Sequence, residues 1–419
     1  MRILWITNVL FPEATAKLMG EKDIRGTGGW MIGLAESINK HDTNTQLFVA
    51  ALSSLVSDLR EVKCDMIHYF AIPSRGDEQY YKEYEGYYRD IYQKVKPDIV
   101  HIHGTEFPHS LACINAFGPE KVCVSIQGLA SVYYKHYMAG LSLFDIMLSI
   151  TPASLLKNGI LQGYRSLKRR AKFEEETIRK ASHVLGRTTW DKDHIWAINP
   201  AANYYYGGEI LRSEFYMGDV WKYNSCCHHS IFISQSGYPL KGLHQVLKAM
   251  PLVIRHYPDT TIRVAGNDIT RSGGLKERIK LSDWGNIVKK LIKKNKLEDR
   301  VVFTGPLNAE EMKKEYLNSN VFVCPSCIEN SPNSLGEAQV LGVPIVASYV
   351  GGVMDMMKGD EKHLYRFEEV EMLAQKIVCL FDEADRVNTE AMRQKALLRH
   401  NPVLVTKQIF DIYNKIACL

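Results

Sequence analysis

Short apolar segments that alternate with helical segments constrain the fold of this chain most strongly. In the first half, apolar runs with the length of buried strands lie at 2–7, 46–51, 66–72, 97–103, 122–126 and 184–188. In the second half they lie at 230–234, 261–266, 301–305, 321–325 and 344–347. Strands that alternate with helices form parallel sheets covered on both faces. The sequence therefore predicts two doubly wound α/β units in series.

The alternation is interrupted around 199–225, where Asn, Pro, Tyr and Gly accumulate. We interpret this segment as an inter-domain hinge, with 184–188 as the last strand before it. The predicted domains are 1–200, an N-terminal Rossmann-like domain, and 205–398, a C-terminal one. An amphipathic helix near the end of the chain, within 400–419, is expected to pack back on the first domain. Each half is long enough to bury its own core.

Composition restricts the function without identifying it. The chain has 419 residues, of which 46% are hydrophobic and 24% are charged, as in soluble globular proteins. Its net charge of +5 is too small to indicate nucleic acid as a partner. The first residues start a strand and not a secretory signal, and no stretch reaches the roughly 18 apolar residues of a spanning helix. We expect a cytoplasmic protein.

The nine cysteines do not follow a metal-binding pattern. No second pair of metal ligands accompanies Cys226-Cys227-His228-His229 in the sequence. Likewise, no second CxxC accompanies the one that Cys324 and Cys327 form. Adjacent cysteines do not easily supply two tetrahedral ligands. We interpret these residues as structural or free thiols and predict no metal site.

The segment from Glu329 to Ala338 carries the clearest chemical signal. Its two glutamates, Glu329 and Glu337, are separated by seven residues, and the loop between them is small and polar. The loop opens a helix that runs to about Leu341, where Gly342-Val343-Pro344 ends it and starts a buried strand.

The start of that helix predicts an anion site. Backbone N–H groups near Asn333, Ser334 and Leu335 suit a diphosphate, because a helix N-terminus offers donors and a partial positive charge. Glu337, about one turn into the helix, is placed to accept hydrogen bonds from ribose hydroxyls. Glu329, before the loop, is placed to reach the hydroxyls of a sugar.

With the preceding VFVCPS and the following GVPIVAS and Gly351-Gly352, this segment resembles the donor site of the retaining glycosyltransferases with the GT-B fold (family GT4, or group 1). The resemblance is specific over roughly 30 contiguous residues. The Gly-rich N-terminal loop, 98–103 and 303–305 match it more loosely. It implies a GT-B fold, in which two Rossmann-like parallel-sheet domains face a central cleft.

The resemblance also implies roles for residues outside the segment. Lys241, in Lys241-Gly242, would neutralise the leaving phosphate. Gly28 and Gly29 would let the N-terminal loop approach the same phosphates, because a backbone without side chains comes close. Gly266 and Gly305, each at the end of a predicted strand, complete the expected donor site.

Two departures from the family pattern concern charge. The usual Arg before the Lys is replaced by Gln235 and Ser236, and Arg187 either compensates for it or forms a salt bridge at the hinge. The usual His-Gly after the 122–126 strand is Gln127-Gly128, and Gln127 can bind a sugar hydroxyl but cannot carry a proton. His103 is then the candidate catalytic histidine on the acceptor side, although a strand-end histidine is more often a packed residue.

A basic amphipathic stretch at 157–172 has two interpretations. Charged helices are usually solvated faces, and acidic residues follow it at once. Clustered Lys and Arg beside Leu and Ile also suit an anionic membrane surface. We expect a peripheral contact with the membrane here.

The predicted function is that of a hexosyltransferase. It moves a sugar from a nucleotide-diphosphate sugar, of UDP or GDP type, to a glycan or lipid-linked acceptor, without a metal or other cofactor. The resemblance implies retention at C1 and a role in bacterial surface polysaccharide biosynthesis. Two alternatives stay open: a nucleotide-sugar epimerase of the same architecture, and a nucleotide-sugar-binding protein that has lost catalysis.

Overall fold

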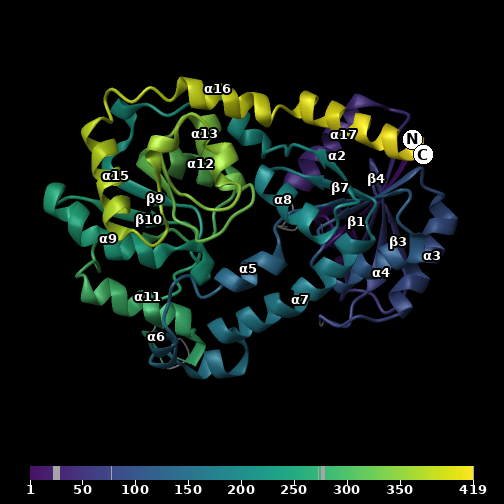
Figure 1. Cartoon of the computed structure of the whole chain (residues 1–419), viewed down its shortest axis with the longest axis horizontal. Helices are drawn as coiled ribbons and strands as arrows, with labels where there is room; N and C mark the ends of the chain where they lie inside the picture. The colour runs from purple at the N-terminus through teal and green to yellow at the C-terminus, as the bar shows by residue number, and fades with distance from the viewer. Residues whose placement is uncertain (22–28, 77, 272, 275–278, 419) are drawn as a thin grey trace. The chain divides into compact units, whose positions relative to one another are not determined.

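A computed structural model describes residues 1–21, 29–76, 78–271, 273–274 and 279–418 of the chain. The chain divides into two compact units, each built around one sheet (Figure 1). The first unit contains Met1–Ser131, Lys168–Arg212 and Leu398–Leu419, and the second contains Val132–Leu167 and Ser213–Leu397.

The sheet of the first unit has eight strands in the order β3-β4-β2-β1-β5-β6-β7-β8. All neighbours pair in parallel except β3 and β4, which form an antiparallel pair. The strands are β1 (Arg2–Thr7), β2 (Gln46–Ser53), β3 (Arg60–Lys63), β4 (Ile67–Pro73), β5 (Ile99–His103), β6 (Val122–Ser125), β7 (His183–Gly186) and β8 (Asn203–Tyr206). The expectation that 184–188 is the last strand was wrong, because β8 extends the sheet beyond β7.

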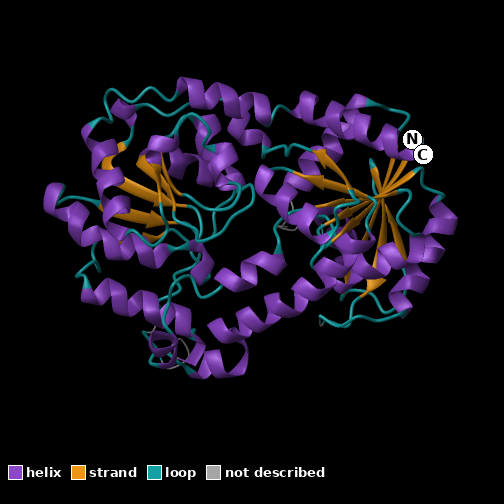
Figure 2. Cartoon of the chain, viewed as in Figure 1, coloured by secondary structure: helices purple, strands orange, loops and turns teal. Residues whose placement is uncertain are grey.

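Helices cover the strands of the first unit (Figure 2). Those that belong to this unit alone are α1 (Pro12–Met19), α2 (Gly29–His41), α3 (Glu83–Val95), α4 (Pro108–Phe117), α8 (Thr189–Ile198) and α17 (Pro402–Ala417). The last of them completes the core. Tyr413 of α17 is fully buried, and its hydroxyl accepts a hydrogen bond of 3.0 Å from Nε1 of Trp5 in β1.

The sheet of the second unit is parallel throughout, in the order β11-β10-β9-β12-β13-β14. The strands are β9 (Cys227–Ile233), β10 (Thr261–Val264), β11 (Val301–Phe303), β12 (Ser319–Cys324), β13 (Ile345–Ser348) and β14 (Leu364–Tyr365). Side chains that alternate along β9 and β12 enter two separate cores. Ile231 and Val321 enter one core, while Phe232 and Phe322 enter the other. This is the pattern of a sheet buried on both faces.

Helices and short turns connect the strands of the second unit (Figure 2). They are α6 (Leu143–Met147), η1 (Ser154–Asn158), η2 (Ser213–Tyr216), η3 (Tyr223–Ser225), η4 (Pro239–Lys241), α9 (Leu243–His256), α11 (Asp283–Lys294), α12 (Ala309–Asn318), α13 (Asn333–Leu341), α14 (Val353–Met356), η5 (Glu361–His363) and α15 (Val370–Asp382). Three further helices pass from one unit to the other: α5 (Ala130–His136), α7 (Ile160–Lys180) and α16 (Glu390–Arg399).

The segment Val132–Leu167 belongs to the second unit, whereas the predicted ranges assigned it to the first. Ile146 and Ile160, which are 1% and 2% exposed, pack into the core on one face of the second sheet. The change from the first unit to the second near Arg212 lies inside the segment 199–225 that the sequence singled out.

Candidate donor site

Two loops of the second unit leave the sheet where the strand order reverses. From β9 the chain continues to β10 on one side, and it later returns to place β12 on the other side of β9. In open α/β sheets, ligands bind at such a switch point, beyond the carboxyl ends of the strands. Lys241 follows β9, and Glu329 follows β12, so both predicted residues lie at this point.

The structure brings Lys241 and Glu329 into contact. The Lys241 Nζ atom lies 2.6 Å from Oε1 of Glu329, and the two side chains are 19% and 9% exposed. Ser326 Oγ donates to the same Glu329 oxygen at 2.7 Å. Burial by itself lowers the pKa of Lys241, but the charge of Glu329 and the neighbouring Tyr238 outweigh it and raise that pKa. The lysine therefore keeps its positive charge in a largely buried place.

The turn that carries Lys241 is fixed against the loop after β12. Gly242 has a φ of +72°, and a Cβ atom there would lie 1.7 Å from the carbonyl oxygen of Pro325. The N–H of Cys327 donates to the carbonyl of Leu240 at 2.8 Å. Only glycine fits this contact, so the Lys241-Gly242 pair serves both charge and close packing.

A second glycine contact holds the backbone of Glu329. The N–H of Gly352 donates to the Glu329 carbonyl at 3.1 Å. At Gly351, where φ is +49°, a Cβ would lie 1.9 Å from that same oxygen. The Gly351-Gly352 pair of the family pattern thus positions Glu329 through its main chain.

The start of α13 offers fewer donors than the sequence suggested. The N–H groups of Leu335 and Gly336 both donate to the carbonyl of Pro332, at 3.0 and 3.3 Å. The Leu335 N–H is therefore used for a hydrogen bond within the first helical turn, which Pro332 closes. Within the described residues, no such bond involves the N–H of Asn333 or Ser334. The buried Oδ1 of Asn333 also has no hydrogen-bond partner there, and buried polar atoms normally have one.

Glu337 lies one turn into α13 and is 4% exposed. Residues three and four apart share one helix face, so Glu337 stands on the face that begins with Asn333 and Ser334. Leu335, Ala338 and Leu341 of the same helix enter the core. Glu337 therefore lies about one helical turn from the backbone N–H groups of Asn333 and Ser334.

Gly266 and Gly305 meet at the ends of β10 and β11. Each N–H donates to the other's carbonyl, at 3.0 and 3.1 Å, in an isolated bridge. Their φ angles are +108° and +81°, and a Cβ at either position would have no atom within 4 Å. The backbone here is exposed to open space at the same end of the sheet as Lys241, where a flat group can approach it.

The predicted residues of the first unit have other surroundings. His103 is 1% exposed, and its ring lies 3.9 Å from that of His101 and 4.5 Å from that of Trp5, measured between centroids. Burial, with the charges of His101 and Arg187, keeps its pKa well below the usual value. Of the two interpretations of His103, a neutral and buried ring corresponds to a packed core residue. The geometry gives no support to a catalytic role on the acceptor side.

Arg187 forms an ion pair inside the first unit. Its guanidinium lies 2.6 Å from Oε1 of Glu209, and the two side chains are 10% and 5% exposed. This contact corresponds to the salt-bridge interpretation of Arg187 and not to a free phosphate ligand. Gln127 lies just after β6 and is half-buried. Gly28 lies outside the described residues, and Gly29 is the first residue of α2.

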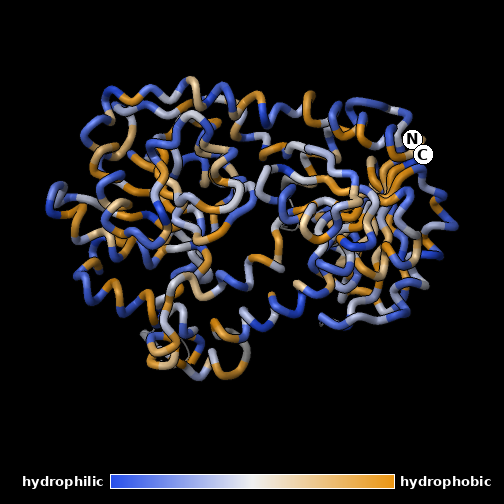
Figure 3. Tube along the Cα trace, in the orientation of Figure 1, coloured by the Kyte–Doolittle hydropathy of each residue, from blue (hydrophilic) through white to orange (hydrophobic). Residues whose placement is uncertain are grey.

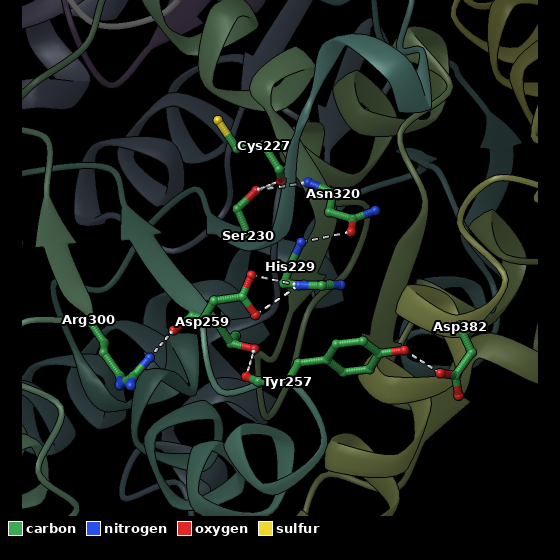
Figure 4. Close-up of polar contacts among 9 residues, drawn as sticks. Cys227, His229, Ser230, Tyr257, Asp259, Arg300, Asn320 and Asp382 are labelled. Atoms are coloured by element: carbon green, nitrogen blue, oxygen red, sulfur yellow. Dashed lines mark hydrogen bonds and ion pairs between the residues drawn. The ribbon is translucent and has the colours of Figure 1, made fainter.

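The two histidines near the start of β9 are held by protein contacts. The Nδ1 atom of His229 lies 2.9 Å from each carboxylate oxygen of Asp259 (Figure 4). The ring of His228 stacks on Tyr223 at 4.3 Å. In the part of the chain that the structure describes, no group of three or more His, Cys, Asp or Glu side chains could hold a metal ion.

Two contributors to the site escaped the sequence analysis. Ser326 orients Glu329, and the Tyr238 ring lies 5.7 Å from the Lys241 ammonium, within the range of a cation–π contact. A small polar residue just after a buried strand was the available signal for Ser326. Nothing in the sequence distinguishes Tyr238 from other loop tyrosines.

Residues 230–396 match the family model of the glycosyl transferases group 1. The second unit carries a glycosyl transferases group 1 domain. Over 182 residues the chain is 27% identical to the D-inositol 3-phosphate glycosyltransferase of Corynebacterium urealyticum, covering 43% of this chain and 41% of that protein. The chain spans less than half the length of the curated relatives that it matches first.

Solved structures confirm the predicted GT-B fold of two parallel-sheet α/β domains. Sucrose-phosphate synthase from Thermosynechococcus elongatus superimposes with a TM-score of 0.70 at 15% identity, covering 99% of this chain and 98% of that one. Anabaena HepE in complex with UDP-glucose does so with a TM-score of 0.63 at 15% identity, covering 99% of this chain and all of that one. At these identities the similarity concerns the fold alone.

Proposed function

We propose that this protein is a hexosyltransferase that uses a nucleotide-diphosphate sugar as donor and retains the configuration at C1. The observation that carries the proposal is the buried Lys241–Glu329 ion pair at the switch point of a group 1 domain. Within the described residues, the N–H groups of Asn333 and Ser334 make no backbone–backbone hydrogen bond, and they follow Glu329 by four and five residues. A fixed cation and a helix N-terminus together suit a diphosphate.

The proposed reaction breaks the bond between C1 of the sugar and the phosphate oxygen. The electron pair of that bond goes to the diphosphate, and the acceptor hydroxyl oxygen forms the new bond to C1 on the same face. The acceptor's proton passes to the leaving phosphate oxygen. The negative charge that develops on the diphosphate is stabilised by Lys241 and by the α13 N-terminus, which is electrostatic catalysis by groups already in place.

The other residues of the second unit bind and orient the donor in this proposal. Glu337 accepts hydrogen bonds from the ribose hydroxyls. Glu329 contacts the sugar while it keeps Lys241 charged. The paired Gly266 and Gly305 leave open space for the flat nucleobase. No step needs a metal ion, because the two cationic elements supply the charge stabilisation.

The nucleotide is proposed to be UDP. The solved structure of Anabaena HepE, whose fold this chain shares, contains UDP-glucose, and a second structure of HepE contains UDP. The acceptor is proposed to be a growing glycan or a lipid-linked saccharide of a bacterial surface polysaccharide. Peripheral contact with the membrane is part of this proposal.

The test is a transfer assay with radiolabelled UDP- and GDP-sugars, with and without a lipid extract. Transfer to a saccharide supports the proposal, whereas epimerised donor or binding without turnover would establish one of the two alternatives. Glu337→Gln should weaken UDP binding about tenfold or more, because the amide NH2 that replaces one carboxylate oxygen cannot accept a hydrogen bond from a ribose hydroxyl. Glu371→Gln, an exposed glutamate on α15, is the matched control. Equal UDP affinity of both variants would contradict the assigned site.

A further inference from the structure

Large apolar side chains are exposed together on one short segment of the second unit. Of the exposed large hydrophobic residues, seven lie within residues 143–156, with exposed fractions between 46% and 77%. We call this set the apolar ridge: Leu143, Phe144, Met147, Leu148, Ile150, Leu155 and Leu156. Hydrophobic colours run along α6 in Figure 3. Asp145 is the only charged residue from Tyr137 to Leu156. Soluble proteins rarely expose such a group without using it for an interaction.

The apolar ridge is held in place by the unit beneath it. Ile146 and Ile160 anchor the segment in the core, at 1% and 2% exposure. The N–H of Ile160 donates to the Asp283 carboxylate at 2.9 Å, and the Asn286 side chain donates to the carbonyl of Ser149 at 3.2 Å. The exposed side chains are therefore presented by a fixed backbone and are not the chance result of a loose loop.

Positive charge borders the apolar ridge. Lys290 of α11 donates to the carbonyl of Leu148 at 2.9 Å, which ties this lysine-rich helix directly to α6. Lys289, Lys293 and Lys294 of the same helix are exposed. The charges of Asp145 and Lys294 both act on Lys248 of α9, so Asp145, the one acidic residue between the ridge residues Leu143 and Leu156, has a basic neighbour.

We propose that the apolar ridge and the lysines of α11 form a docking surface for an anionic lipid membrane. Apolar side chains that project beside clustered lysines match the boundary between acyl chains and anionic headgroups. A second protein surface is the poorer fit, because lysine is depleted in protein–protein interfaces. In the part of the chain that the structure describes, no helix is both long and apolar enough to cross a bilayer.

This inference rests on the membrane contact included in the proposed function and assigns it to a surface different from 157–172. In the structure, Arg169 and Arg170 of α7 both pair with Glu78. Part of the basic character of that stretch is therefore compensated within the first unit. The apolar ridge, by contrast, combines exposed hydrophobic area with adjacent lysines.

The experiment is flotation of the full chain with vesicles of phosphatidylcholine and phosphatidylglycerol, compared with vesicles of phosphatidylcholine alone. The double variant Phe144→Ser/Leu148→Ser should lose at least tenfold in affinity for the anionic vesicles, since each side chain inserts apolar area. Lys293→Gln/Lys294→Gln should lose about 25-fold, at roughly fivefold for each lysine. Binding should also fall in roughly 1 M salt, where the Debye length is about 3 Å.

The matched control is Leu398→Ser/Val403→Ser, which removes two side chains of similar exposure, 65% and 67%, from the first unit. Its affinity should equal that of the parent, and equal thermal midpoints would show that all variants fold. Unchanged flotation of the ridge variants, or no flotation of the parent, overturns the inference. So does a parent that is a dimer in sedimentation and becomes monomeric in the ridge variants. UDP binding of the same proteins in solution tests the proposed function separately.

Discussion

Substitutions at Lys241 and Glu329 can distinguish the contribution of their ion pair to stability from the contribution of Lys241 to catalysis. At 2.6 Å the two charges attract by about 6 kcal/mol with an effective dielectric constant of about 20, before the cost of desolvation. Removing one partner of such a buried pair leaves the other charge uncompensated, which costs about 3–5 kcal/mol. Lys241→Met and Glu329→Gln should each destabilise the second unit by about 3 kcal/mol, lowering its melting temperature by roughly 6–12 °C.

The double variant Lys241→Met/Glu329→Gln should recover most of that stability. It contains neither charge, so no unpaired ion is left in the interior, and replacing a whole buried pair is often neutral. The coupling energy from the cycle is expected to be about 1–3 kcal/mol. Calorimetric unfolding of the four proteins measures it, and Lys407→Met/Glu371→Gln, two exposed residues in different elements, is the control pair.

Sugar transfer should not recover with stability. If Lys241 stabilises the leaving diphosphate, the double variant stays as inactive as Lys241→Met although it is folded. Losing such a preorganised group typically reduces kcat by about 100- to 1,000-fold. Additive single effects, with a coupling below about 0.5 kcal/mol, would refute the buried ion pair. Restored transfer in the double variant would refute the catalytic assignment of Lys241.

Further predictions concern glycines and pH. Gly242→Ala should prevent stable folding of the second unit, because its Cβ would overlap the Pro325 carbonyl. At Gly305 a Cβ meets open space, so Gly305→Ala should cost only about 1–2 kcal/mol of unfolding free energy, for its positive φ. Equal losses of stability in urea unfolding would contradict this contrast. Burial lowers the pKa of His101 and His400 to about 3. Their contribution to stability, present above pH 6.5, should therefore disappear as the pH falls toward 3. A melting temperature that stays constant over this acidic range would contradict the prediction. Burial raises the pKa of Glu174 to about 7, so its effect has the opposite sign: stability falls as the pH rises from about 4.5 to 7, and Glu174→Gln should remove that component.

Local sequence was sufficient to predict the strand, loop and helix that carry Glu329 and Glu337. The strand, loop and helix from Ser319 to Leu341 are contiguous, so the pattern of apolar residues, small residues and glycine fixes them without distant information. The contact of Lys241 with Glu329 depends on β9 and β12 being neighbours in the sheet, which the alternation of strands and helices does not fix by itself.

Other features depend on distant contacts that no local pattern reports. The allocation of Val132–Leu167 to the second unit depends on Ile146 and Ile160 reaching a core formed mostly by later residues. The engagement of the Leu335 N–H depends on how Pro332 closes the first helical turn. The sequence places His103 at the end of a strand, where a side chain could be either buried or exposed. Only the contacts with Trp5 and His101 in the structure show that its ring is enclosed.

The burial of Tyr413 has a consequence for the order in which the protein acquires its structure. Its hydroxyl contacts Trp5 Nε1 and His101 Nδ1, residues that leave the ribosome hundreds of positions earlier. The core of the first unit therefore stays incomplete during synthesis until the second unit and then α17 have been translated. Apolar surface that is exposed in this way is a natural target for chaperones. A chain that ends after the first stretch of the first unit would lack α17 and could not complete that core.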